Sequence, residues 1–112
     1  MTRAKQPIDS TIDKDQEGFL KNLSDWSEQT AMDIAHSEKI TLSDNHWEVI
    51  HLIRNFYHTY KIFPSTRVLV KSMASELGHD KGRSVYLMSL FPGTPLKLLS
   101  KIAGLPKPPN CD

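Results

Sequence analysis

The sequence lacks most of the residues that metal, disulfide or nucleotide chemistry requires. Cys111 is the only cysteine among 112 residues, so an intramolecular disulfide is excluded and a cysteine-based zinc site is not expected. The five histidines include no pair at i, i+4 spacing, and the five glycines are scattered rather than grouped in a phosphate-binding loop. We therefore expect neither a metal ion nor an organic cofactor.

Long apolar runs are also missing, so no membrane-spanning segment is predicted. The first residues include basic side chains without an apolar stretch behind them, and we expect no secretory signal. A single cysteine without an export signal predicts a reducing, cytoplasmic location.

Charge is unevenly distributed, although the net charge is only +1. Residues 1–56 contain 6 Lys and Arg against 10 Asp and Glu, whereas residues 57–112 contain 8 against 3. The basic second half favours an anionic partner, such as RNA or an acidic protein face, although ordinary solvated helix surfaces give the same pattern.

Helical periodicity dominates the rest of the chain. A first helix is predicted to be capped by Asn22 or Ser24 and to reach Ala35. Four more are indicated by apolar spacing, by capping serines and threonine, and by glycine or proline stops. They cover residues 44–61, 65–77, about 85–91 and 95–103.

Residues 8–13 are predicted to form a short hairpin that turns at Asp9 and Ser10. The expected fold is therefore mostly α, a small compact bundle of about five helices with a short N-terminal β-hairpin. We expect residues 1–104 to form this domain and residues 105–112 to form a mobile C-terminal arm.

The arm carries the most distinctive feature, a thiol at the second-to-last position. A cysteine that serves packing usually lies in an apolar core, whereas Cys111 follows Pro106, Pro108 and Pro109, which favour extended backbone. Leu105 is the one apolar anchor expected in this arm. Because the thiolate is the reactive form, Cys111 is the predicted sulfur-carrying nucleophile. A frayed terminus that happens to contain cysteine is the alternative.

Several motifs, in order along the chain from Glu17, resemble the DsrC/TusE family of sulfur-carrier proteins. The matching segments are Glu17–Leu20, Trp26–Glu28, His46–Val49, Arg54–Tyr57, Pro64, Arg67–Lys71, Lys81–Gly82, Leu90–Pro92 and Lys101–Pro108, followed by Cys111. The resemblance implies a small helical fold with an N-terminal hairpin and a flexible arm whose cysteine accepts and donates persulfide sulfur. It makes the chain a sulfurtransferase, a persulfide carrier without a formed active-site pocket.

Within that family a second cysteine, eleven positions before the last one, marks members that work with dissimilatory sulfite reductase. Ser100 occupies that position here. The resemblance is thus to the single-cysteine branch, which receives sulfur from a TusBCD-type donor complex. That branch passes sulfur to the tRNA 2-thiouridylase that builds 2-thiouridine at the wobble position. A DsrC-like component of dissimilatory sulfur metabolism is the alternative.

Four basic residues are candidates to support the thiolate or to dock a partner, because nearby cations lower the pKa of a thiol. Arg67 and Lys71, one turn apart on a predicted helix, match family positions, whereas Lys101 and Lys107 are nearer to Cys111 in sequence. Each could equally be an ordinary solvated base.

Two other functions are compatible with the sequence. The predicted helices at 44–61 and 65–77 are joined by a short turn, as in a helix-turn-helix regulator, with Ser65, Thr66 and Arg67 at the start of a recognition helix. The apolar run at 68–70 leaves few polar positions to read bases, so direct nucleic-acid binding is not expected. The chain could also be a scaffold that docks to a larger enzyme without relaying sulfur.

Overall fold

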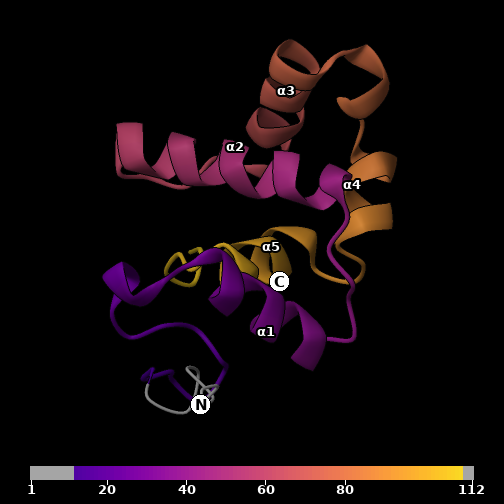
Figure 1. Ribbon diagram of the computed structural model, residues 1–112. Coiled ribbons are helices and arrows are strands. Elements are labelled where there is room, and N and C mark those ends of the chain that lie inside the picture. Colours follow the sequence, from indigo (N-terminus) through magenta and orange to yellow (C-terminus); the bar gives the residue numbers. More distant parts are fainter. Residues whose placement is uncertain (1–11, 110–112) are drawn as a thin grey trace.

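The computed structural model describes residues 12–109, and this part of the chain is predominantly helical (Figure 1). Its elements, in chain order, are the 3-10 turn η2 (Leu23–Asp25), α1 (Glu28–Ser37), α2 (Asp44–Tyr60), α3 (Thr66–Leu77), the 3-10 turn η3 (His79–Lys81), α4 (Ser84–Leu90) and α5 (Pro95–Ile102). The prediction of a small, mostly α fold is confirmed.

The predicted hairpin at residues 8–13 lies almost wholly outside the described residues. Residues 12–109 contain no strand, only an isolated antiparallel bridge between Lys14 and Leu20. Asp15 stabilises the turn inside this bridge, since its Oδ1 accepts hydrogen bonds from the N–H groups of Glu17, at 2.9 Å, and Phe19, at 3.0 Å. This part of the chain therefore gives the hairpin no support, but it contains a tight turn at residues 15–19.

The start of α1 differs from the prediction. Ser27 caps the helix, because its Oγ accepts a hydrogen bond from the Thr30 N–H at 3.2 Å. Asn22 instead caps the separate turn η2 through the Ser24 N–H at 3.1 Å. The predicted cap is wrong because the sequence pattern did not separate this 3-10 turn from the helix that follows it.

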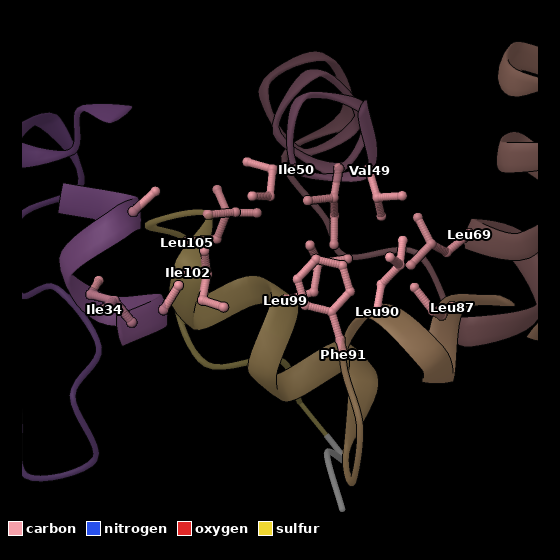
Figure 2. Packing of buried hydrophobic residues seen from close by; sticks show 14 of the residues in the cluster. Ile34, Val49, Ile50, Leu69, Leu87, Leu90, Phe91, Leu99, Ile102 and Leu105 are labelled. Carbon is pink, nitrogen blue, oxygen red and sulfur yellow. The ribbon is translucent and has the colours of Figure 1, made fainter. Parts of the chain in front are cut away.

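The hydrophobic core lies where α2, α4 and α5 meet, and α1 packs on α5 from the other side (Figure 1). Figure 2 shows the Phe91 ring near the middle of this core, close to Leu99 and Leu90. Phe91 and Leu99 are fully buried, and burying a side chain of this size stabilises a fold by about 1.5–3 kcal/mol. Leu105, beyond the end of α5, belongs to the same cluster.

His46 connects the start of α2 with the end of α4. Its Nε2 donates to the Leu90 carbonyl oxygen at 3.0 Å, so that Nδ1 accepts from the Ser43 backbone N–H at 3.0 Å. The ring packs edge-on against Phe91, with centroids 5.3 Å apart. Burial lowers the pKa of His46 below its ordinary value. The arrangement thus requires the neutral Nε2–H tautomer.

We expect His46→Gln to flatten the pH dependence of stability. The folded pKa is below the unfolded value of about 6.5, so the contribution of neutral His46 is complete above that pH and is lost as the pH falls through the folded pKa. Glutamine at this position can still accept from the Ser43 N–H, as in an ordinary capping box. The free energy of unfolding, measured in urea between about pH 5 and pH 7.5, should therefore change less in the variant. An equal acid-induced loss in both proteins would assign the titration to another group.

Candidate functional site

Cys111, the predicted nucleophile, lies outside the described residues. The site is therefore built from the chain that leads to it, the C-terminal segment of residues 105–109, and from the residues that hold this segment at the end of α5. In Figure 1 this region lies between α1 and α2, beside α5.

The end of α5 is a Schellman motif centred on Gly104. The Leu105 N–H donates to the Ser100 carbonyl at 3.0 Å, and the Gly104 N–H donates to the Lys101 carbonyl at 3.1 Å. Gly104 has a φ of 73°, a left-handed conformation that favours glycine. A Cβ at this position would lie 2.2 Å from Cδ1 of Trp26. Only glycine therefore fits both the backbone and its neighbour.

Trp26 and Arg54 bind the last two carbonyls of this helix end. The indole Nε1–H of Trp26 donates to the Ile102 oxygen at 2.9 Å, and Nη1 of Arg54 donates to the Ala103 oxygen at 2.7 Å. The guanidinium also lies 3.7 Å from the centre of the Trp26 ring, a cation–π contact. We call Trp26, Arg54 and Gly104 the exit clamp, because together they fix where the C-terminal segment leaves α5.

The C-terminal segment packs against the helical body. Leu105 is only 5% exposed and Pro108 is buried, while Lys107 Nζ lies 3.0 Å from Oε2 of Glu17. Glu17 also binds Lys97 at 3.3 Å, and these two ammonium groups, Lys107 foremost, hold the pKa of Glu17 below its usual value. Exposed ion pairs add little stability, so the two buried side chains dominate the docking. The mobility of the arm stays a prediction.

The structure places Lys101 and Lys107 beside the same turn, the one at residues 15–19. Lys101 Nζ pairs with Oε2 of Glu38 at 2.9 Å and lies 5.6 Å from the centre of the Phe19 ring. Lys107 reaches the same turn through Glu17. Both ammonium groups are therefore bound to carboxylates in this conformation.

Arg67 and Lys71 lie elsewhere. Both are exposed on α3, which Figure 1 shows across α2 from α5 and the C-terminal segment. Neither forms an ion pair with any of residues 12–109. The structure thus does not bring this pair together with Lys101 and Lys107. Its thiolate-supporting role, and the DNA-binding alternative at the start of α3, stay predictions.

Ser100, where one family branch carries a second cysteine, faces the core. Its side chain is 0% exposed and its Oγ has no hydrogen-bond partner. A cysteine here would be enclosed, so a bond from this position to the C-terminal segment would require the side chain to leave the core.

Residues 12–109 contain no cluster of three or more His, Cys, Asp or Glu side chains that could hold a metal ion. In the same range, no helix is both long enough and apolar enough to cross a membrane.

Sequence reasoning missed several residues of this site. From the sequence, Glu17 and Trp26 belong only to the segments that match the family, and Pro108 is only a residue that favours extended backbone. Arg54 gave a usable signal, because it follows Ile53 within the apolar stripe of α2. A basic side chain beside such a stripe is partly buried and therefore needs hydrogen-bond acceptors nearby.

A family model described as "DsrC like protein" matches residues 7–111. The chain belongs to this family. It is 51% identical to Sulfurtransferase TusE of Escherichia coli (strain K12) and 53% identical to Sulfurtransferase TusE of Sodalis glossinidius (strain morsitans), each over 100 residues. These alignments cover 89% of this chain and 92% and 93% of the two relatives. The family predicted from the motifs is confirmed.

Solved structures of DsrC proteins have the same fold. The NMR structure of Allochromatium vinosum DsrC superposes with a TM-score of 0.82 at 42% identity, covering 90% of each chain. The oxidized gamma-subunit of the dissimilatory sulfite reductase (DsrC) from Archaeoglobus fulgidus gives a TM-score of 0.79 at 34% identity, covering 90% of this chain and 92% of that one. The helical arrangement around α5 is therefore that of the DsrC-like family.

Proposed function

We propose that this DsrC-like chain is a TusE-type sulfurtransferase, a cytoplasmic sulfur-relay protein that carries persulfide sulfur on Cys111. The observation that carries the proposal is its identity of 51–53% to proteins named Sulfurtransferase TusE, over 89% of its length. The single thiol that follows the proline-rich segment supplies the chemistry.

The transfer needs no net redox change. The Cys111 thiolate attacks the outer sulfur of a donor persulfide; the new S–S bond forms as the donor's S–S bond breaks, and the donor leaves as a thiolate. In the second step an acceptor thiolate attacks the outer sulfur of the Cys111 persulfide, and Cys111 leaves as a thiolate. The proposed donor is a TusBCD-type complex, and the proposed acceptor is a tRNA 2-thiouridylase that modifies wobble uridine.

The exit clamp fixes the position at which the C-terminal segment, which leads to Cys111, leaves the helical body. Trp26 and Arg54 hold the end of α5 in one orientation, so a partner that docks on the helical body meets the C-terminal segment at a defined place. The contacts beyond the clamp, Leu105, Lys107 and Pro108, must be released for the segment to extend into a recessed site. Lys107, freed from Glu17, is then available as a cation near the thiol in sequence.

A reconstituted relay tests the proposal. The purified chain, incubated with a cysteine desulfurase, L-cysteine and a TusBCD-type complex, should gain the mass of one sulfur atom, and reductant should remove it. Adding the tRNA 2-thiouridylase with ATP and tRNA should then give 2-thiouridine in amounts that depend on this chain. Failure to gain sulfur, or thiouridine formation that is unaffected by omitting the chain, would contradict the proposal.

The DsrC-like alternative is favoured by the structural similarity to DsrC proteins. The fold does not separate a TusE-type relay protein from a DsrC-like component. The residue that separates them is Ser100, because a serine there leaves Cys111 as the one thiol of the chain. Sulfur transfer to a tRNA-modifying enzyme needs one thiol, whereas an internal disulfide needs two. Oxidation should therefore give only intermolecular disulfides.

A further inference from the structure

A pocket lined by basic side chains lies beside the exit clamp, and none of its lining residues belongs to the ion pairs of Glu17 with Lys97 and Lys107. The pocket has a volume of about 360 Å³. It lies between the turn η2, the C-terminal half of α2 and the start of the C-terminal segment. Its lining residues are Leu23, Ser24, Arg54, Tyr57, His58, Lys61, Gly104 and Leu105. None of them is acidic.

Three nitrogen-bearing side chains in this lining come from one face of α2 and its C-cap. Arg54 and His58 are spaced i, i+4, which places them one above the other on α2, and Lys61 is the C-cap of this helix, with a left-handed φ of 59°. The hydroxyl groups of Ser24 and Tyr57 lie in the same lining. The pocket therefore combines several hydrogen-bond donors with positive charge.

Arg54 is a partly buried cation without a carboxylate. It forms no ion pair within residues 12–109, whereas the partly buried Lys81, Lys97 and Lys101 each pair with a glutamate. Burial also lowers the pKa of Arg54, because desolvation disfavours its charged form. The Ala103 carbonyl and the Trp26 ring stabilise this guanidinium, but neither neutralises its charge, so its remaining N–H groups at the pocket wall can bind an external anion.

The guanidinium is also held in place before any ligand binds. One of its nitrogens, Nη1, donates to Ala103, and its plane lies over the Trp26 ring. A guanidinium has five N–H donors, so others remain for a ligand. A fixed arginine fork loses little conformational freedom on binding an oxyanion.

We propose that this pocket binds a phosphate group. Phosphate offers more acceptor oxygens and more charge than a carboxylate, which matches three nitrogen-bearing side chains and two hydroxyls. The volume also lies within the range of about 300–1,000 Å³ that is usual for small-ligand sites. The inference does not depend on sulfur transfer. The phosphate could come from an RNA backbone or from a free phosphorylated molecule.

The competing explanation is that His58 and Lys61 only offset the negative end of the α2 dipole. That role needs no ligand, and it predicts that phosphate and chloride have the same effect on the pocket residues. It does not extend to Arg54, which lies at least one turn earlier on α2 and binds a carbonyl at the end of α5 instead. A comparison of anions therefore separates the two explanations.

The test uses the full chain labelled with ¹⁵N and titrated with sodium phosphate, or with sodium chloride at equal ionic strength. Three reporters line or adjoin the pocket: the Trp26 indole N–H, the Gly104 amide and the Arg54 Nε–H. Phosphate should shift these signals saturably and chloride should not. Lys61→Glu should weaken phosphate binding by about tenfold or more, the effect of losing one charge-assisted hydrogen bond. Lys39→Glu, the same charge change in an exposed turn after α1, is the matched control.

Two further titrations identify the source of the phosphate. A short single-stranded RNA that shifts the same three signals, and loses this effect in Lys61→Glu, assigns the site to an RNA backbone. Saturation by inorganic phosphate without any response to RNA assigns it to a free phosphorylated molecule. The proposal is overturned if chloride acts like phosphate, if both lysine variants weaken binding equally, or if a polyglutamate peptide shifts these signals at lower concentration than phosphate does. Unchanged sulfur loading of Lys61→Glu would show that the sulfur chemistry is separate.

Discussion

Replacing Cys111 by serine should abolish sulfur acceptance while leaving the stability of the fold unchanged. Serine keeps the size of the side chain but is a far weaker nucleophile and cannot carry persulfide sulfur. Because the side chain keeps its size and Cys111 follows three prolines, beyond the predicted helices, we expect the free energy of unfolding to change by less than about 0.5 kcal/mol. Intact mass after incubation with the sulfur donor, together with urea unfolding, measures both effects.

Asp112→Ser is the matched control for this experiment, because it alters the neighbouring residue and keeps the thiol. It should still gain one sulfur atom. Sulfur that remains bound to the Cys111→Ser variant would place the carrier elsewhere, and a large fall in its stability would show that Cys111 contributes to packing.

Gly104→Ala should be the most destabilising single change in the exit clamp. Alanine at a φ of 73° costs about 1–2 kcal/mol, and its Cβ would overlap the Trp26 ring at 2.2 Å. Moving that ring breaks its hydrogen bond to Ile102 and its contact with Arg54, so a total loss of about 3–5 kcal/mol is expected. Thermal and urea unfolding, with tryptophan fluorescence as the probe, would show it.

Gly93→Ala separates the two causes of that loss. Gly93 has a similar φ of 91°, but within residues 12–109 no heavy atom beyond its chain neighbours lies within 4 Å of its would-be Cβ. Its replacement should therefore cost only the backbone part, about 1–2 kcal/mol. Equal losses at the two positions would mean that the Trp26 ring yields easily and that the clamp is not rigid.

Much of the fold could be predicted from local sequence signals. Ser43 and Ser65 start their helices, and Pro95 and Gly104 bound α5, because caps, prolines and left-handed glycines act within one turn. The failure at Ser27 has the same origin, since four polar residues within residues 22–27 could each cap a helix. Only the course of the chain through η2 selects among them.

The exit clamp and the docked segment could not be predicted in this way. Trp26 and Arg54 meet the end of α5 from 76 and 49 residues away in sequence, and no local pattern encodes such a contact. Glu17 is likewise 90 residues from Lys107. Cys111 was found from its chemistry and from the motifs that precede it, which require no tertiary contact.

The burial of Leu105 and Pro108 has a consequence for the apparent affinity of any partner that takes up the whole segment. Such a partner binds only the undocked population, so its apparent dissociation constant rises by the inverse of that fraction. Docking worth about 1.4 kcal/mol would leave roughly one molecule in ten undocked. A partner surface that buries Leu105 and Pro108 again, in its own apolar contacts, would offset this penalty. Two partners with equal intrinsic affinity for the free end, of which only one makes such contacts, would then differ about tenfold in apparent dissociation constant.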